Sequence, residues 1–445
     1  MSPRPLRVLT GIKPTGVPHL GNYVGAIRPA VAASAAPGVE SFFFLADYHA
    51  LISTQDPARV QRSTLEVAAS WLACGLDPAR VAFYRQSDIP EITELTWLLT
   101  CVAGKGILNR AHAYKAAVDR NREEGEDDDA GVTAGLFMYP VLMAADILLF
   151  NADRVPVGRD QVQHIEMARD FGQRFNHLYG EHFTLPEAVI EEQVATLPGL
   201  DGRKMSKSYD NVIPLFAPRE ALRKAVFAIV TDSRAPGEPK ETEGSALFEL
   251  YRAFASEAET AAMREAFAAG IAWGEAKERL LERIDVEVAP LRERYEALVA
   301  DPAAIERQLR EGAARLREEV AQPFMRELRA AVGLQDLSVP LAGRDAPAEA
   351  APAAPPQFKQ YREDDGRFYF KLVDGDRLLL QGAGHASPRD AGRLIAALKR
   401  DAGAGLRHAG SGMVHLGERV VGELGEAVAV EELVAALARF AEDAA

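Results

Sequence analysis

The segment LRVLTGIKPTGVPHLGNYVGAI, residues 6–27, predicts a short strand, a glycine-rich turn and a helix in immediate succession. Unpaired backbone N–H groups and the positive end of the helix dipole would then point at one place, which favours an anion. Gly21 would let a flat purine approach the backbone, and His19 would donate to a phosphate oxygen. The segment therefore predicts a phosphate-binding turn.

Further apolar runs follow at residues 42–45, 81–84 and 154–157, and helical patterns such as 60–74 and 94–102 lie between them. This alternation predicts an α/β fold built on a doubly wound parallel sheet. In such sheets, ligands bind at the carboxyl ends of the strands, where the turn after the first strand lies.

A second segment, DGRKMSKS at residues 201–208, has two lysines three positions apart in a loop preceded by glycine. Mobile ammonium groups of this kind suit a departing pyrophosphate. Taken alone, a glycine-rich turn or a lysine–serine loop is usually an ordinary solvated loop. Both segments in this order on an α/β pattern are far more specific and predict an ATP site.

The stretch 135–150 is apolar almost throughout and contains one acid, Asp146. A buried carboxylate is costly unless it has a specific donor, and one candidate donor is a ligand N–H. Tyr139, Met143 and Asp146 are spaced by four and then three residues, so they share a helical face and suit an indole. The alternative is an ordinary core helix whose acid pairs with an arginine, and the stretch by itself favours that alternative.

The two segments together resemble the two signatures of class I aminoacyl-tRNA synthetases, and the second signature matches at every position. The stretch 135–166 is similar to the tryptophan-binding region of the tryptophanyl-tRNA synthetase family, and the resemblance runs from about residue 6 to about residue 333. It implies a Rossmann-like catalytic domain and a helical domain. Beyond the resemblance, strand and helix patterns predict a small α+β C-terminal domain that the minimal enzyme does not need.

The resemblance also implies roles for individual residues. Catalysis would involve His19, Lys115, Lys204 and Lys207. ATP would be bound by Lys13, Pro14, Thr15, Gly21, Asn22, Gly158, Arg159, Asp160, Leu197, Lys204, Met205, Ser206, Lys207 and Ser208. Tryptophan would be bound by His49, Tyr139, Met143, Asp146, Val155, Val157 and Gln161, with Asp146 accepting the indole N–H and His49, Tyr139 and Gln161 around the amino and carboxylate ends.

Some positions depart from the family's commonest pattern. Lys13 stands where many relatives have glutamine, Leu9 where an aromatic residue often borders the pocket, and Asn22 where the general class I signature has a second histidine. None of these changes removes a group that the chemistry requires. The implied reaction is attack of the tryptophan carboxylate on the α-phosphorus of ATP, followed by transfer to tRNA(Trp), with Mg²⁺ carried by the nucleotide and no metal site in the protein.

Composition limits the function further. The 445 residues are 48% apolar and 26% charged, which is typical of a soluble protein with two or three domains, and no apolar run reaches membrane-spanning length. With no segment resembling a targeting peptide, we expect a cytoplasmic location. The net charge of −14 disfavours loose nucleic-acid binding, so tRNA would need a local basic face. Cys74 and Cys101 are expected to be buried structural thiols.

The predicted domains are residues 1–216, catalytic; 217–335, helical and, by resemblance, anticodon-binding; 336–356, a Pro/Ala-rich linker; and 357–445, appended. In the appended domain, a hairpin over 367–381 and a helix over 388–400 are followed by a looser echo at 413–422 and 430–440. Phe358, Lys359, Tyr361, Arg362 and Arg367 form either a tRNA contact or, more simply, a strand surface and its core. The acidic run 122–131 is either a mobile solvated loop or a flap over ATP.

Three alternatives remain open. A tyrosyl-tRNA synthetase shares the signatures, although Met143 and the Val155–Val157 wall disfavour a phenol hydroxyl deep in the pocket. A tryptophan-sensing paralogue would not charge tRNA, and a small-molecule nucleotidyltransferase would share only the first signature. For a tryptophanyl-tRNA synthetase we expect a homodimer, by resemblance.

Overall fold

The computed structural model describes residues 4–190, 197–338, 356–363, 365–375, 377–401, 403–409, 412–426 and 428–442. The chain divides into two compact units, Met1–Asp336 and Leu337–Ala445. Most of the predicted linker, residues 339–355, lies outside the described residues. The first unit contains both the predicted catalytic and the predicted helical domain, and the boundary between them at residues 216 and 217 stays a prediction.

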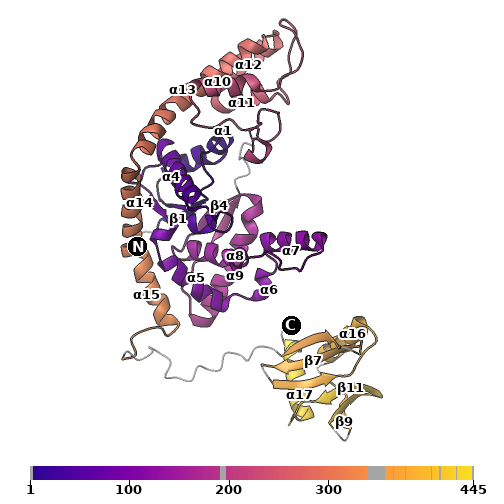
Figure 1. The fold of residues 1–445 in the computed structure, drawn as a ribbon. Coiled ribbons are helices and arrows are strands. Elements are labelled where there is room, and N and C mark those ends of the chain that lie inside the picture. Colours follow the sequence, from indigo (N-terminus) through magenta and orange to yellow (C-terminus); the bar gives the residue numbers. More distant parts are fainter. Residues whose placement is uncertain are drawn as a thin grey trace. The chain divides into compact units, whose positions relative to one another are not determined.

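The first unit is built on a parallel sheet of five strands in the order β3-β2-β1-β4-β5 (Figure 1). The strands are β1 (Leu6–Ile12), β2 (Val39–Leu45), β3 (Ala82–Arg85), β4 (Arg154–Val157) and β5 (Glu187–Ile190). The predicted doubly wound sheet is confirmed, and β5 is an additional edge strand. The strand order reverses direction between β1 and β4, and the carboxyl ends of strands at such a reversal are where open sheets bind ligands.

Side chains alternate strictly across the sheet, as period-two geometry requires. In β2, Phe43 and Leu45 belong to one core and Phe42 and Phe44 to the other. The first core is covered by η1 (Tyr23–Ile27), α4 (Pro57–Ala73), α10 (Arg219–Ala228), α11 (Ala246–Phe254), α12 (Glu257–Ala268) and α13 (Trp273–Ala300). The second is covered by α5 (Glu91–Val102), α8 (Ala134–Leu148), α9 (Val162–Tyr179) and α15 (Gln322–Ala331).

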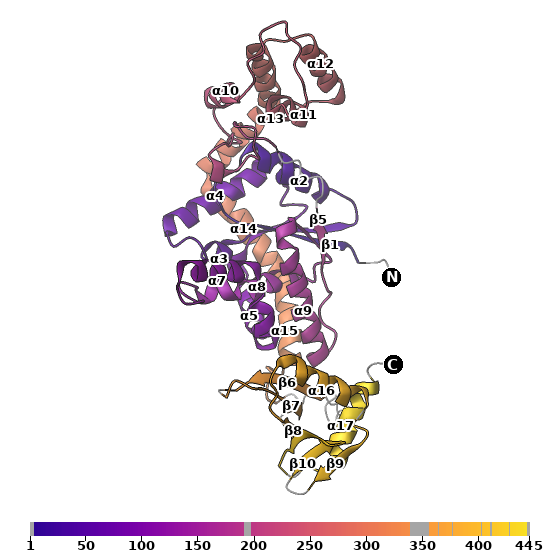
Figure 2. The same ribbon diagram turned by 90° about the vertical axis from the view of Figure 1, so that its right-hand side faces the viewer.

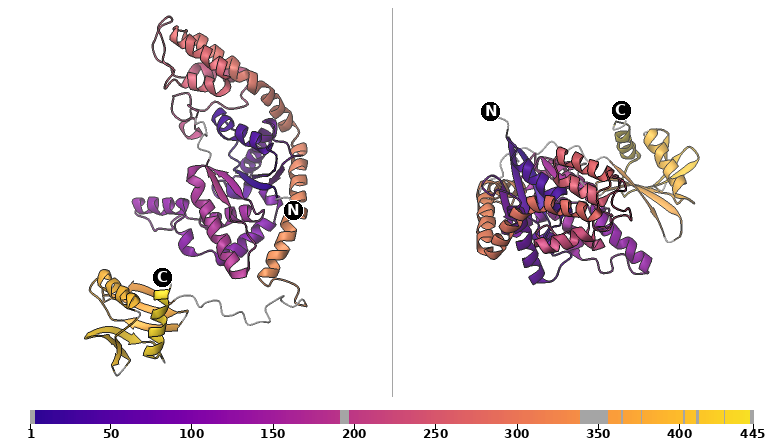
Figure 3. Two further views of the ribbon diagram at one scale, coloured as in Figure 1. Left: turned by 180° about the vertical axis from the view of Figure 1, so that it is seen from behind. Right: turned by 90° about the horizontal axis from the view of Figure 1, so that it is seen from above.

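The predicted helical region is largely helical over residues 219–228 and 246–331, whereas residues 229–245 between α10 and α11 form neither helix nor strand. Helices α13, α14 (Pro302–Leu316) and α15, with the π-turn η5 (Arg317–Ala321) before α15, follow one another along one side of the unit (Figure 1, Figure 3). Helix α14 lies directly on edge strand β3, because a β-carbon at Gly312 would fall 2.0 Å from the carbonyl oxygen of Phe83. Glycine at this position therefore permits the close approach of helix and strand.

Shorter elements connect the larger ones. They are α1 (Leu20–Asn22), α2 (Arg28–Ser34), α3 (Asp47–Ala50), η2 (Gln86–Asp88), α6 (Lys105–Leu108), α7 (His112–Glu124), η3 (Arg159–Gln161) and η4 (Lys207–Tyr209). The prediction of two buried thiols is wrong for Cys101, which is exposed on α5. Cys74 is partly buried, and this burial raises its pKa to about 12. Within the described ranges, no helix is both long and apolar enough to cross a membrane.

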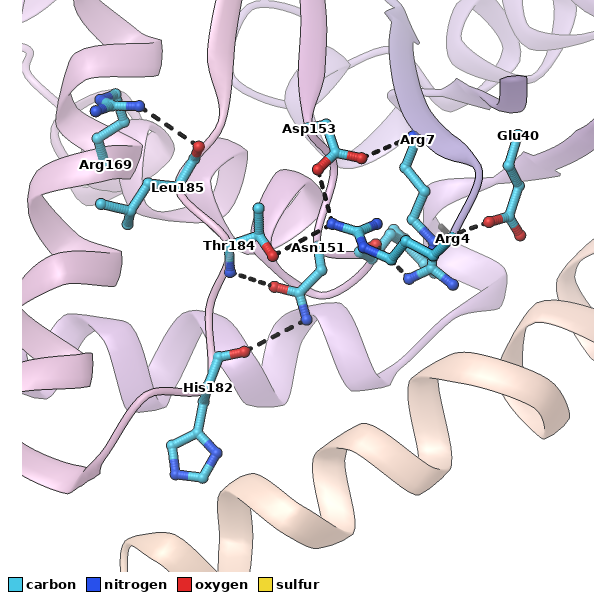
Figure 4. Close-up of polar contacts among 10 residues, drawn as sticks. Arg4, Arg7, Glu40, Asn151, Asp153, Arg169, His182, Thr184 and Leu185 are labelled. Carbon is cyan, nitrogen blue, oxygen red and sulfur yellow. Dashed lines mark hydrogen bonds and ion pairs between the residues drawn. The ribbon is translucent and has the colours of Figure 1, made fainter. Parts of the chain in front are cut away.

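Polar contacts close the amino-terminal edge of the sheet (Figure 4). The carboxylate of Asp153, just before β4, accepts the backbone N–H of Arg7 at 2.8 Å and Nη2 of Arg4 at 2.7 Å. Asn151, with φ of 47°, accepts the backbone N–H of Thr184 at 2.7 Å. These contacts fix the starts of β1 and β4 and the approach to β5, and leave the opposite, carboxyl edge for ligands.

The second unit is an antiparallel sheet in the order β6-β7-β8-β11-β10-β9 with two helices (Figure 2). The elements are β6 (Gln357–Arg362), β7 (Phe368–Asp374), β8 (Arg377–Gly382), α16 (Pro388–Arg400), β9 (Leu406–Ala409), β10 (Met413–Leu416), β11 (Arg419–Leu424) and α17 (Val430–Glu442). One core combines residues of both helices with one face of the sheet. The predicted hairpin, helix and echo are confirmed, and each hairpin is preceded by one more strand.

Candidate active site

The first signature forms the turn between β1 and α1, and His19 caps that helix. The backbone N–H of Asn22 donates to His19 Nδ1 at 3.2 Å, and the backbone N–H of His19 donates to Asn22 Oδ1 at 3.1 Å. A β-carbon at Gly21 would lie 3.0 Å from His19 Nδ1. Gly21 therefore makes room for the histidine ring itself, and Asn22 positions that ring.

His19 is a neutral donor in this arrangement. The side chain is buried, and burial, followed by the charge of Lys207, lowers its pKa to about 4. Because Nδ1 accepts the Asn22 N–H, the single ring proton resides on Nε2. The ring thus offers one N–H to an oxygen without itself carrying charge near neutral pH.

The second signature docks on the first. Lys207 Nζ donates to the carbonyl oxygen of Thr15 at 2.9 Å, across 192 positions of sequence. The backbone N–H of Leu20 donates to the carbonyl of Ile213 at 2.9 Å, and that of Leu215 to the carbonyl of Pro18 at 3.0 Å. The predicted proximity of the two segments is therefore observed. Partial burial lowers the pKa of Lys207, and the nearby Glu66 carboxylate opposes that shift.

An asparagine that sequence reasoning missed shapes the second loop. Asn211 is buried; its Nδ2 donates to the carbonyl of Lys204 at 3.1 Å, and its Oδ1 accepts the backbone N–H of Ser206 at 2.8 Å. Leu197 and Met205 are also buried in the core beneath the loop and are linked by a backbone hydrogen bond of 2.8 Å. The loop is therefore held by its backbone, which leaves the Lys204 side chain exposed.

Several predicted ATP ligands lie at the solvent surface. Lys13, Thr15, Gly158, Arg159, Asp160 and Ser208 are exposed, Ser206 is half-buried and Pro14 is buried. Lys115 is exposed on α7, which projects from the body of the unit (Figure 1), and among the described residues its side chain makes no hydrogen bond or ion pair. The structure therefore does not bring Lys115 to the two loops.

The acidic run 122–131, which begins in the last turn of α7, is largely exposed, as expected, but it is anchored at several points. Arg122 forms two hydrogen bonds of 2.7 Å with the Asp128 carboxylate, and the Tyr114 hydroxyl donates to Asp129 at 2.7 Å. Arg122 to Glu124 belong to α7 itself. The expected loop is therefore shorter than the acidic run and folds back on the helix.

Asp146 on α8 is fully buried, and the structure supplies the specific donors that its burial requires. Gln86 Nε2 donates to its two oxygens at 2.8 and 2.9 Å, and His49 Nε2 donates to Oδ2 at 2.9 Å. No arginine within the described ranges pairs with it. Burial raises the pKa of Asp146, and the hydrogen bonds from His49 and Gln86 oppose that shift.

The two residues that donate to Asp146 differ from what the sequence predicted. His49 lies beside Asp146, at the end predicted for the indole N–H rather than for the amino and carboxylate groups. Gln86 was not predicted; it follows β3 directly, and its Oε1 accepts the backbone N–H of Tyr48 at 3.1 Å. Its place at the carboxyl end of a strand was the available signal. We call Asp146, Gln86 and His49 the Asp146 site.

A directed chain of hydrogen bonds runs from Tyr139 to Asp160. The Tyr139 hydroxyl is 2.6 Å from His164 Nε2, His164 Nδ1 is 3.1 Å from Gln161 Oε1, and Gln161 Nε2 donates to Asp160 at 2.7 Å. Burial raises the pKa of Tyr139 and lowers that of His164, so both are neutral and the tyrosine is the donor. The rings of His49 and Tyr139, 6.3 Å apart, link this chain to the Asp146 site.

Apolar residues flank these polar groups. Val155 on β4 is buried, and Val157 and Met143 are half-buried against the same core. A β-carbon at Gly158 would fall 2.7 Å from Asp160 Oδ1, so glycine allows that carboxylate to fold over the turn. The predicted wall residues therefore share the end of β4 and the adjoining face of α8.

A doubly wound parallel sheet whose carboxyl edge holds two docked signature loops defines the class I aminoacyl-tRNA synthetases. The family model that matches residues 1–286 is described as tRNA synthetases class I (W and Y), and the chain belongs to this family. Among curated relatives, the chain is 73% identical over 392 residues to the tryptophan–tRNA ligase of Xanthomonas campestris pv. campestris, covering 88% of this chain and 91% of the relative. Its membership of the tryptophan–tRNA ligases, which join tryptophan to tRNA, is thereby shown.

Other relatives agree. The tryptophan–tRNA ligase of Pseudomonas aeruginosa is 62% identical over 403 residues, covering 89% of this chain and 90% of the relative. The crystal structure of tryptophanyl-tRNA synthetase from Campylobacter jejuni, complexed with ADP and tryptophan, matches with a TM-score of 0.68 and 40% identity. That match covers all of the Campylobacter chain but 74% of this one, so about a quarter of this chain has no counterpart there.

Proposed function

We propose that the Asp146 site recognises the indole N–H of tryptophan. The observation that supports this proposal is how many acceptor positions of the buried Asp146 carboxylate already take part in hydrogen bonds. A carboxylate has about four acceptor positions, and Gln86 and His49 use one on Oδ1 and two on Oδ2. The remaining position on Oδ1 suits a single N–H donor, and indole has one. Met143, Val155 and Val157 would contact the ring.

Free hydrogen-bond donors and acceptors likewise indicate where the ammonium and carboxylate groups of tryptophan would bind. In the chain from Tyr139 to Asp160, the one acceptor nitrogen of His164 is already used, whereas among the described residues Gln161 keeps one free N–H proton and Asp160 keeps carboxylate acceptor positions. Gln161 would donate to the tryptophan carboxylate, and Asp160 would attract the ammonium group. The order of the chain would therefore hold the reacting carboxylate toward β4 and the signature loops.

The two signature loops would bind ATP, which arrives with Mg²⁺. His19 Nε2–H would donate to a phosphate oxygen, and the ammonium groups of Lys204 and Lys207 would neutralise charge on the β- and γ-phosphates. A tryptophan carboxylate oxygen attacks the α-phosphorus in line, the bond from that phosphorus to the bridging oxygen breaks, and pyrophosphate leaves. Catalysis consists of positioning and charge stabilisation, without a covalent enzyme intermediate.

In the second step, a ribose hydroxyl at the 3′ end of tRNA(Trp) attacks the adenylate carbonyl, the ester to the ribose forms, the hydroxyl proton is released, and AMP leaves with the electron pair of the broken carboxylic–phosphoric anhydride bond. Residues 217–335 would contact the anticodon region. Lys115, which the structure does not bring to the two loops, would contact the triphosphate only after a movement of α7 toward them. Since tRNA charging serves protein synthesis, the location would be cytoplasmic.

We further propose a homodimer that forms through α5. Trp97 is 67% exposed on this helix, and Thr93 and Cys101, one turn before and one turn after it, are exposed and uncharged. Large aromatic side chains exposed on a neutral surface are typical of protein interfaces.

The test of the Asp146 assignment is pyrophosphate exchange with tryptophan and with phenylalanine. For Asp146→Ala we expect most of the preference for tryptophan to be lost, because a site that hydrogen-bonds a substrate N–H rejects analogues lacking it by up to about 10⁴- to 10⁵-fold. Asp285→Asn is the matched control, since this buried acid pairs with Arg219 and Arg292 in the helical region. An undiminished preference in Asp146→Ala would refute the assignment.

A further inference from the structure

The second unit consists of two copies of one structural repeat, β6-β7-β8-α16 and β9-β10-β11-α17. In the first, Lys371 pairs with Gln381, Leu372 with Leu380 and, after a bulge, Val373 with Leu378. In the second, Met413 pairs with Glu423, Val414 with Gly422 and, after a bulge, His415 with Val420. Because the bulge falls at the same step, each residue of one hairpin has a defined equivalent in the other.

Comparing residues at equivalent positions shows which ones both repeats share and which ones occur in the first repeat alone. Phe370 and Leu372 of β7 are fully buried under the helices, so Tyr369 and Lys371 point to the opposite, helix-free face of the sheet. On that face Lys371 pairs with Lys359 of β6. The equivalent pair in the second repeat is Met413 with Ala409. The fold therefore does not require lysines at these positions.

Two tyrosines adjoin the lysines on the same face. Tyr361 and Tyr369 are a cross-strand pair whose rings are 6.0 Å apart and 23° from parallel. Gln381 Nε2 donates to the Tyr361 hydroxyl at 2.6 Å, and the Tyr369 ring lies on Gly384, where a β-carbon would be 2.8 Å from its Cζ. Both rings are only partly buried. Because contacts already hold both rings in place, they form a preorganised aromatic surface that loses little conformational entropy on binding.

Two positive charges, on Lys359 and Lys371, lie opposite each other on this surface, and their repulsion lowers the stability of the unit. Like charges directly opposite each other on neighbouring strands are unfavourable, and among the described residues neither Lys359 nor Lys371 forms an ion pair. Lys371 Nζ lies 5.9 Å from the Tyr361 ring centroid instead. The nearby acid Asp365 is engaged by the Tyr369 hydroxyl at 2.7 Å. An unneutralised lysine pair in a chain with net charge −14 is complementary to a polyanion.

We propose that this surface, the Tyr-Lys face formed by Lys359, Tyr361, Tyr369 and Lys371, binds unpaired nucleotides of the tRNA substrate. Tyrosine rings on an open sheet face stack bases, and flanking lysines neutralise phosphates, as in sheet-based readers of single-stranded RNA. The RNA is expected to be tRNA, because the ligases of this family join tryptophan to tRNA. The face would hold tRNA without taking part in amino-acid activation.

The test uses the full chain and two probes, an unmodified tRNA(Trp) transcript and a labelled oligouridylate of about ten nucleotides, with binding followed by fluorescence anisotropy. Lys359→Glu/Lys371→Glu should weaken binding of both probes at least about tenfold and reduce the slope of log affinity against log salt for the oligouridylate by about 1.4. Tyr361→Ala/Tyr369→Ala should also weaken both at least about tenfold. Tyr361→Phe/Tyr369→Phe retains the rings and should bind like the parent chain.

The matched control is Arg389→Glu/Arg393→Glu, which makes the same charge change at exposed positions of α16, on the helix side of the sheet. It should alter affinity for either probe less than about twofold. Pyrophosphate exchange should be unchanged in every variant, which separates a failure of this proposal from a failure of the active-site assignment. The proposal is overturned if the lysine and alanine variants bind both probes as the parent does, or if they change only self-association measured by light scattering.

Discussion

At the scale of single residues, Gln86 decides how the buried Asp146 is held. Its amide donates to both carboxylate oxygens, and its own oxygen is fixed by the backbone N–H of Tyr48. A hydrogen bond to a charged group contributes about 1.5–3 kcal/mol when it is buried. Gln86 is therefore a positioning residue for the proposed indole acceptor, acting through Asp146.

We predict that Gln86→Met raises the Kd for tryptophan about tenfold to about a hundredfold, measured by calorimetry. Burial already raises the pKa of Asp146, and losing a donor to the charged form would raise that pKa further. The ionised carboxylate is the stronger acceptor for the proposed indole N–H, so affinity should fall as pH falls, and the fall should begin at a higher pH in the variant. Gln173→Met, at an exposed position of α9, should leave both the affinity and its pH profile unchanged.

The protonation state of His19 gives a second prediction. Since its pKa is lowered to about 4, the ring should stay neutral at pH 5.5, where an ordinary histidine is mostly protonated. Nitrogen-15 NMR of labelled histidines, assigned with His19→Gln, should show a proton on Nε2 throughout pH 5.5–8. A midpoint near 6.5 for this ring would contradict a buried, neutral His19.

At the scale of elements, the contact between α14 and edge strand β3 requires a residue without a side chain, Gly312. We predict that Gly312→Ala lowers the free energy of unfolding of the first unit by about 1–3 kcal/mol, because the helix or strand must shift to accommodate the added carbon. Gly274→Ala in α13 is the control: nothing lies within 4 Å of its β-carbon position, so alanine should be neutral or slightly stabilising there. Urea unfolding of both variants would make the comparison.

The elements themselves were largely predictable. Alternation of apolar runs and helical periodicity indicated the strands around β1 and the helices between them, since those patterns are local. Strand β5 and the two outer strands β6 and β9 were not separated as elements, because short edge strands bury little and so have weak patterns. The exposure of Cys101 was also mispredicted, since an apolar helix does not reveal which of its faces the rest of the chain covers.

At the scale of the whole molecule, the proposed dimer can be tested directly. Trp97→Arg should convert the protein from dimer to monomer in size-exclusion chromatography with light scattering, because a charge would be desolvated at the centre of the interface. Val286→Arg, at a position 71% exposed on α13, should leave the dimer intact. If the chain is already monomeric, or if Trp97→Arg stays dimeric, the α5 interface is excluded.

The motifs around His19, Lys204 and Asp146 were recognisable from sequence because each chemical role needs a particular residue type at a short, fixed spacing. The tertiary structure decided what those motifs touch: Lys207 on Thr15, Gln86 and His49 on Asp146, and Asn211 within the second loop. Such partners come from segments far apart in the chain, and only close packing of the folded sheet determines which of many polar side chains becomes the donor. Likewise, tyrosines and lysines were visible along β6 and β7, but strand pairing determined that they share one open face.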